Sequence, residues 1–127
     1  MTLSISKAFD FSASHVLSGL PDDHKCTRLH GHSYRVRVEL WGDVDEHGLL
    51  IEFGQLDWLR DYIAANLDHR HLNDVLTFNP TAELISSWLA DVVRSWILDR
   101  PEADRVNAIA IGVAEGRMTW ATTQLTM

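Results

Sequence analysis

The sequence contains one cysteine, Cys26, so no internal disulfide can form and the small disulfide-stabilised class is excluded. It also lacks the run of about 18 apolar residues that a membrane-spanning helix needs. Its N-terminus lacks the apolar stretch with basic flanks that is typical of a secretory signal. We therefore expect a cytoplasmic protein with no membrane partner.

Positive charge is scarce as well. Eleven Lys and Arg residues stand against 18 Asp and Glu, which gives a net charge of −7 with neutral His. This balance produces a field that repels polyanions, so nucleic acid is not an expected partner. The chain has no repeats, low-complexity segments or linkers rich in proline or glycine, and its 127 residues are an ordinary length for one domain. We predict a single domain over residues 1–127.

Two segments alternate between apolar and polar residues, which predicts half-buried strands. Residues 3–15 carry apolar side chains on odd positions, with Lys7 as the exception, and residues 29–41 carry them on even positions. A stretch rich in Gly, Pro and Asp separates these two segments, so they are predicted to form a hairpin. Residues 105–114 and 118–126 are predicted to form a second hairpin.

Between the hairpins the apolar residues recur every three or four positions, which is typical of amphipathic helices. The first predicted helix covers residues 53–67. The second begins near Asn79, which can cap it, with Pro80 suited to its first turn, and ends before Asp99. The order β-β-α-α-β-β predicts an α+β fold, with an antiparallel sheet covered on one face by two helices. Because the outer strands of such a sheet are free, pairing with other copies of the chain is expected.

Four of the seven histidines lie within residues 15–32. His30 and His32 are two positions apart in a predicted strand, so both point to one face, and Gly31 removes bulk from the opposite face. His15 ends the preceding strand on its inward-facing positions. If the two strands pair, the three imidazoles meet, and three His ligands without an obvious fourth predict a catalytic zinc site. Unrelated histidines satisfied by hydrogen bonds or solvent are the alternative interpretation.

Cys26 lies four residues before His30, among polar neighbours that include Lys25 and Arg28. These neighbours do not suit an inert buried thiol. Two interpretations remain open. Cys26 is either a fourth zinc ligand that closes a structural site, or a thiolate that is favoured by nearby cations and acts as a general base.

Two further positions carry candidate acid–base groups. Asp68 directly precedes His69, and a neighbouring carboxylate can orient an imidazole for proton transfer. An exposed His at the end of a helix explains the same pair equally well. Glu115 follows the third strand on its inward-facing positions, where a buried carboxylate would need a donor partner. A solvated carboxylate in a turn is the alternative for Glu115.

Together these residues form five motifs in chain order: F-S-A-S-H at 11–15, C-T-R-L-H-G-H at 26–32, L-D-H-R-H-L-N at 67–73, N-P-T-A-E at 79–83 and V-A-E at 113–115. The set resembles the 6-pyruvoyltetrahydropterin synthase family. Within the family it is most similar to the 6-carboxytetrahydropterin synthases of the 7-deazaguanine, or queuosine-type, branch. The closer likeness rests on the three residues between Cys26 and His30, since pyruvoyl enzymes of the mammalian type usually have five there.

The resemblance implies a tunnelling fold, whose subunits pair their sheets edge to edge into trimeric barrels, commonly stacked as hexamers, with active sites at subunit interfaces. It implies conversion of 7,8-dihydroneopterin triphosphate to 6-carboxy-5,6,7,8-tetrahydropterin with release of acetaldehyde and triphosphate. It also implies residue roles: Zn²⁺ held by His15, His30 and His32, a base in Cys26, a proton carrier in Asp68 with His69, and a pterin anchor in Glu115 helped by Thr81 and Glu83.

The sequence departs from the family pattern at two places. Glu52 stands where the family usually has Asp, which affects a cap more than the chemistry. Gly116 and Arg117 follow Glu115, where a hydroxyl residue is common. Contacts to the triphosphate are not assigned by any motif. Lys25, Arg28 and Arg70 are the candidates.

Three other interpretations remain. The first is a sister activity that makes 6-pyruvoyltetrahydropterin or cleaves another pterin side chain. The second is a non-catalytic module in which Cys26 joins the three histidines in a closed zinc site. A cupin-like metal site is the third, but two helices in mid-chain do not suit an all-β barrel.

Overall fold

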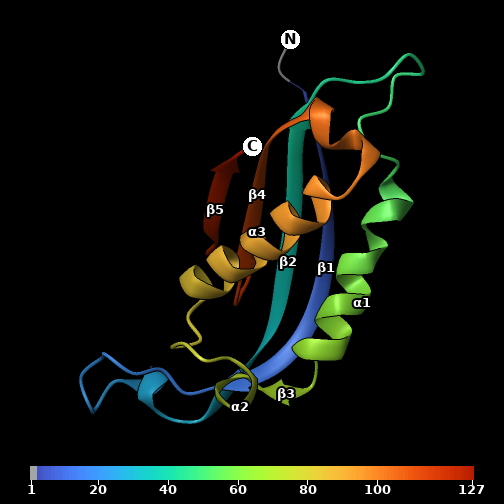
Figure 1. The fold of residues 1–127 in the computed structure, drawn as a ribbon. Helices are drawn as coiled ribbons and strands as arrows, with labels where there is room; N and C mark the ends of the chain where they lie inside the picture. The colour runs from blue at the N-terminus through green and yellow to red at the C-terminus, as the bar shows by residue number, and fades with distance from the viewer. Residues whose placement is uncertain (1–2) are drawn as a thin grey trace.

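The computed structural model describes residues 3–127, which form one mixed sheet with helices on one of its faces (Figure 1). The strands are β1 (Ser4–His15), β2 (His30–Gly42), β3 (Arg70–His71), β4 (Val106–Ala114) and β5 (Ala121–Thr126). The helices are α1 (Asp57–Asn66), α2 (Leu72–Val75) and α3 (Ala82–Leu98), with 3₁₀ turns η1 (Lys25–Thr27), η2 (Phe53–Leu56) and η3 (Pro101–Arg105). None of the helices in the described part of the chain is long and apolar enough to cross a membrane.

The sheet has the strand order β3-β1-β2-β4-β5. β1 pairs antiparallel with β2, β2 with β4, and β4 with β5, which confirms both predicted hairpins and the α+β class. The expectation of a purely antiparallel sheet was wrong, because β3 lies parallel to β1 at its edge. With two residues, β3 is too short to show any alternation in the sequence.

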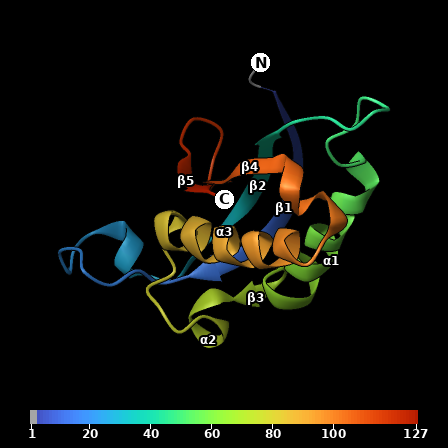
Figure 2. The same cartoon turned by 45° about the horizontal axis from the view of Figure 1, so that its top comes forward.

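The helices α1 and α3 pack against one face of the sheet and leave the other face without a helix (Figures 1 and 2). The odd positions of β1 and the even positions of β2 supply the buried side chains on the helix-covered face. Lys7 is the exception on β1, because its ammonium group pairs with the Asp57 carboxylate in the first turn of α1. The pairing explains how a charged residue stands on a core-facing position.

The start of α3 differs from the prediction. Thr81, not Asn79, is the N-cap, since its hydroxyl oxygen accepts a hydrogen bond from the Leu84 amide at 3.1 Å. The Asn79 side chain instead binds the loop after β1, accepting from the Ser18 amide at 3.0 Å and donating to the Ser18 carbonyl at 2.9 Å. Asn79 therefore joins two distant segments of the chain, which local sequence preferences do not reveal.

Gly42 is required where β2 ends. The register shifts between Trp41 and Gly42, and a Cβ atom at Gly42 would overlap the carbonyl oxygen of Arg105 and lie 2.9 Å from Leu50 Cδ1. We expect Gly42→Ala to lower the free energy of unfolding by about 3 kcal/mol, because backbone must move to admit the methyl group. Urea denaturation measures this loss.

The matched control is Gly116→Ala, since a Cβ atom at Gly116 would meet no atom within 4 Å. The free energy of unfolding of this variant should lie within about 0.5 kcal/mol of that of the unchanged protein. Equal stability of the two variants would contradict the close approach seen at Gly42.

Candidate metal and active site

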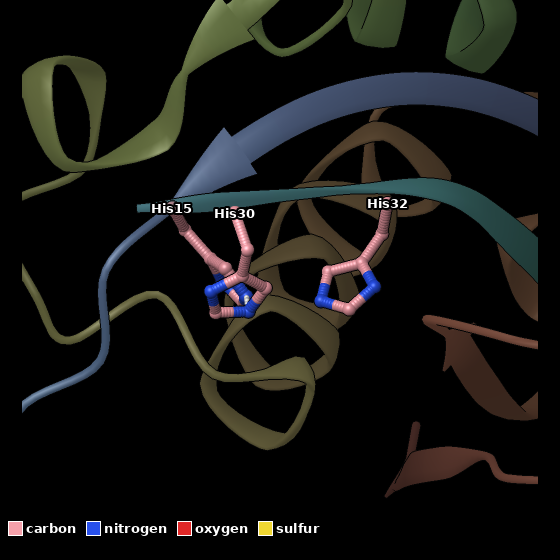
Figure 3. Close-up of side chains that lie close together, drawn as sticks. All are labelled: His15, His30 and His32. Carbon is pink, nitrogen blue, oxygen red and sulfur yellow. Dashed lines mark hydrogen bonds between the residues drawn. The ribbon is translucent and has the colours of Figure 1, made fainter. Parts of the chain in front are cut away.

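Three histidines converge on the helix-covered face of the sheet. His15 ends β1 directly opposite His30 of β2, and His32 follows two positions later on the same face. Their side chains leave the strands in the same direction, toward α3 (Figure 3). One ring nitrogen of each lies within 4.8 Å of the others. The hairpin thus brings the three imidazoles together, as their strand positions predict.

The outer ring nitrogens of two histidines are held by backbone carbonyls. His15 Nδ1 lies 2.8 Å from the Pro80 carbonyl oxygen, and His30 Nδ1 lies 2.7 Å from that of Arg28. A carbonyl oxygen only accepts, so Nδ1 donates in both rings and each Nε2 keeps its lone pair. The two Nε2 atoms face each other at 2.9 Å. Lone pairs that converge in this way are favourable when a cation binds them.

His32 supports the same conclusion. Its Nε2 atom is buried and has no hydrogen-bond partner among the described residues. A buried polar atom without a partner is costly, and metal coordination would satisfy it. Three imidazoles are a donor set suited to Zn²⁺ and other transition metals, and they leave coordination positions for water or substrate. The cluster therefore fits a metal ion.

Burial favours the neutral form of two of these histidines, His15 and His32. It is the largest cause that lowers the pKa of both His15 and His32 below 6.5, while the Glu115 carboxylate acts in the opposite direction, as does the Pro80 carbonyl for His15. Neutral imidazole is the form that binds a metal. Since these pKa values lie below those of the unfolded chain, their contribution to stability is fully present above pH 6.5 and is lost as the pH falls from 6.5 through the lower pKa values of the folded state.

Glu115 lies beside the histidine cluster, and Glu83 lines a hollow together with Glu115. Glu115 Oε2 is 3.7 Å from His32 Nε2. Glu83, in the first turn of α3, lines the same hollow of about 230 Å³ as Glu115. The Thr81 hydroxyl accepts from the Leu84 amide as the helix cap, so its own proton stays free to donate. The structure therefore brings two carboxylates and the start of α3 to one side of the cluster.

Asp68 and His69 lie at the edge of the sheet beside Ser12, and Asp68 lines a pocket of about 570 Å³ together with Glu115. The Ser12 amide donates to Asp68 Oδ1 at 2.9 Å, and this bond is the main cause that lowers the pKa of the Asp68 carboxyl, with smaller contributions from His69. His69 Nδ1 lies 3.0 Å from the same oxygen. Ser12 precedes His15 by three residues, roughly 10 Å along a strand, and no hydrogen bond joins this pair to the cluster in the described chain.

His69 has an unusual backbone and an open side chain. Its φ of 57° makes it the one non-glycine residue with positive φ among residues 3–127, and such conformations are rare and strained. The side chain is 82% exposed. The strained turn therefore presents the imidazole to solvent, with Asp68 fixing its orientation.

Cys26 lies in η1, within the loop that joins β1 to β2. Its carbonyl accepts from the Leu17 amide at 2.9 Å, so the loop folds back beside the end of β1. Its amide donates to His24 Nδ1 at 3.1 Å. Cys26 Sγ is not among the atoms that converge with the three histidines in the described structure. The closed site with four protein ligands is therefore not formed here.

Two residues of this site were missed by the sequence analysis. The Tyr34 hydroxyl lies 3.2 Å from His15 Nδ1, and its ring stacks on Phe11 with centroids 4.6 Å apart. The second is Pro80, whose carbonyl holds His15. Tyr34 follows His32 by two residues on the same strand, so the alternation of β2 predicts that both side chains point to the same face. The contact between the Pro80 carbonyl and His15 depends on tertiary packing alone.

We expect Tyr34→Phe to weaken metal binding roughly tenfold, because the hydroxyl beside the Nδ1 atom of His15 is removed while the ring is kept. Competition with a chromogenic chelator measures the metal affinity. Tyr62→Phe is the matched control, since Tyr62 packs between Trp58 and Trp88 away from the cluster. If both variants bind the metal equally well, Tyr34 does not position His15.

Residues 4–125 match the family model described as 6-pyruvoyl tetrahydropterin synthase. The chain belongs to this family. It is 40% identical to the 6-carboxy-5,6,7,8-tetrahydropterin synthase of Synechocystis over 67% of this chain and 70% of that protein. It is 30% identical to the protein of the same name from Bacillus subtilis over 76% of this chain and 68% of that protein.

A solved structure shares the fold. The 6-pyruvoyl tetrahydropterin synthase of Plasmodium vivax superposes with a TM-score of 0.81 over 100% of this chain and 99% of that one, at 17% identity. The tunnelling fold implied by the five motifs is therefore confirmed for the single chain.

Proposed function

We propose that this protein is a zinc-dependent 6-carboxytetrahydropterin synthase. It converts 7,8-dihydroneopterin triphosphate and one water molecule to 6-carboxy-5,6,7,8-tetrahydropterin, acetaldehyde and triphosphate, and serves 7-deazaguanine or queuosine-type biosynthesis. The observation that carries the proposal is the convergence of the three Nε2 ligands beside Glu115. The names of the Synechocystis and Bacillus relatives support the carboxy product.

The metal is held by His15, His30 and His32. When bound, Zn²⁺ polarises the hydroxyl groups of the substrate side chain and stabilises negative charge that develops as a proton leaves. Glu115 binds the amino-pyrimidinone edge of the pterin through a paired, charge-assisted contact, and it is 29% exposed at the edge of its hollow. Glu83 and Thr81 extend this contact surface from the start of α3.

Two groups move protons. Cys26 removes a proton from the substrate side chain, and the His69 imidazole, oriented by Asp68, carries the second proton. The Ser12 amide lowers the pKa of the Asp68 carboxyl below its ordinary value of 3.8, so the carboxylate keeps its charge and favours an imidazole that gains positive charge during transfer. A free thiolate of this kind requires a reducing compartment such as the cytoplasm.

The separation of these groups supports an active site between copies of the chain. Asp68 and His69 lie at the edge of the sheet, and the His69 side chain is open to solvent. The outer edge of β5 has no partner strand within residues 3–127. We infer that copies pair edge to edge into a trimer, or a dimer of trimers, so that His69 of one copy completes the metal site of its neighbour.

The sister activity is the second candidate. Formation of 6-pyruvoyltetrahydropterin would use the same metal, base and proton carrier, and the family model carries that name. The two activities differ in products, because only the carboxy activity releases acetaldehyde. A non-catalytic zinc module is less well supported, since Cys26 is not part of the ligand cluster.

The deciding experiment incubates zinc-loaded protein with 7,8-dihydroneopterin triphosphate and measures acetaldehyde together with the pterin product. We expect acetaldehyde and the carboxypterin in equal amounts. The pyruvoyl product without acetaldehyde would assign the sister activity. Zinc bound through Cys26 in the presence of ligand, with no turnover, would contradict the enzyme function.

Cys26→Ala tests the base. We expect activity to fall at least about 100-fold, the usual contribution of a positioned general base, while zinc content stays at one ion per chain. Metal analysis of the purified variant separates the two roles of the thiol. Loss of zinc would show that Cys26 is a ligand and not the base.

A further inference from the structure

The loop that joins β1 to β2 carries Cys26 and extends away from the sheet (Figures 1 and 2). Residues 18–25 are all exposed, so packing does not fix their position. Backbone hydrogen bonds inside the loop, such as that from the His24 amide to the Pro21 carbonyl at 2.8 Å, give it a local shape but do not attach it to the sheet. The position of Cys26 therefore depends on how the loop is held where it leaves β1.

Residues 16–18, which directly follow β1, are bound on two opposite sides. The Leu17 amide donates to the Cys26 carbonyl at 2.9 Å. Before and after Leu17, both backbone groups of Val16 and of Ser18 are bound by side-chain amides. Successive residues of an extended chain direct their backbone groups to opposite sides, so Leu17 faces Cys26 while its two neighbours face the other edge.

The two side-chain amides belong to Asn73 and Asn79. Asn73 Oδ1 accepts from the Val16 amide at 2.8 Å, and Asn73 Nδ2 donates to the Val16 carbonyl at 2.9 Å. Asn79 binds both backbone groups of Ser18 in the same way. A carboxamide offers an acceptor and donors side by side, so it pairs with a backbone N–H and C=O as a neighbouring strand would. Two such pairs fix the direction of residues 16–18 relative to α2 and to the segment before α3.

We propose that Asn73 and Asn79 are positioning residues for Cys26. They hold residues 16–18, and the Leu17 amide then holds the backbone of Cys26. The role of Cys26 as a base rests on the proposed function, whereas the anchoring of its loop does not. A base must stand within hydrogen-bond reach of the proton that it removes, so a displacement of about 1 Å is enough to lose much of the rate.

Asn79 also connects this anchor to the metal ligands. It directly precedes Pro80, whose carbonyl accepts from His15 Nδ1 at 2.8 Å. One dipeptide therefore holds a metal ligand with its backbone and the loop with its side chain. Asn73 lies in α2, apart from this dipeptide, so its substitution tests the loop with the least effect on His15.

Amide hydrogen exchange on the metal-loaded, full-length protein tests the anchor. Asn73→Asp keeps the size of the side chain but places an oxygen against the Val16 carbonyl, where Nδ2 now donates. We expect the Leu17 amide to exchange at least about tenfold faster, because residues 16–18 then open more often. Leu17 is the informative position, since its amide bonds to Cys26 and not to either asparagine.

Asn107→Asp is the matched control for this measurement. Asn107 is exposed, and it lies at the end of β4 that pairs with the end of β2 at Gly42, far along the strand from His30. The exchange rate of the Leu17 amide in this variant should stay within about twofold of that in the unchanged protein.

Kinetics test whether the anchor acts through the thiol. In Asn73→Asp we expect kcat to fall at least about tenfold while KM stays within about twofold and zinc content stays at one ion per chain. In the Cys26→Ala background the same substitution should change kcat by less than about twofold, because the group that it positions is already absent. A merely structural role would lower kcat by the same factor in both backgrounds.

Asn79→Asp is the second variant, and it keeps the test decisive if Asn73→Asp does not fold. It should raise the exchange rate of the Leu17 amide in the same way. An unchanged exchange rate at Leu17, or equal losses of kcat with and without the Cys26 thiol, would overturn the proposal. If the unchanged protein releases no acetaldehyde, the proposed function fails, and exchange at Leu17 alone decides whether the two asparagines hold the loop.

Discussion

The hydrogen bond between His15 and the Pro80 carbonyl joins the metal cluster to the helical layer. It orients His15 so that Nε2 faces the other two ligands, and it fixes the segment that leads into α3. Because α3 begins two residues later, the same contact determines where Thr81 and Glu83 stand. The buried tyrosine beside His15 makes that position rigid, since His15 and Tyr34 both have no exposed surface. The orientation of His15 and the position of the start of α3 are therefore linked through one backbone carbonyl.

The alternation of β1 and β2 gives one hairpin two different chemical surfaces. On the helix-covered face the hairpin presents three imidazoles above an apolar core. On the other face the intervening positions are serine and glycine, which suit a hydrated, polar pocket. A slip of one residue in the pairing would exchange the two faces and destroy both. The register that sets His15 opposite His30 is thus a constraint on both surfaces at once.

Strands and helices whose apolar residues recur at short, regular intervals could be predicted from the sequence. The alternation of β1 and β2 predicted which histidines share a face, and the three- and four-residue steps predicted α1 and α3. Features that depend on contacts between distant segments could not be predicted. Asn79 resembles a helix cap in the sequence, yet its amide binds Ser18. The two residues of β3 have no pattern, and their strand exists only because β1 offers an edge.

For the candidate active site, too, the sequence predicted local contacts but not the positions of distant residues, as Asp68 and His69 show. Their adjacency predicted an oriented imidazole, and the structure shows the 3.0 Å contact. The sequence could not show that this pair stands at the sheet edge while the metal ligands stand at the end of the hairpin. The described chain thus holds the exposed His69 imidazole apart from the metal-ligand cluster, and assembly of copies stays a prediction of the proposed function.

Charge explains how an acidic protein could accept a triphosphate. Of the 11 Lys and Arg residues, five are neutralised by ion pairs in the described chain, namely Lys7, Arg37, Arg60, Arg94 and Arg100. Arg70 is not among them, and its guanidinium donates to the Ala65 carbonyl near the end of α1. Long-range attraction is absent at a net charge of −7, so recognition of the anion must come from short, charge-assisted hydrogen bonds.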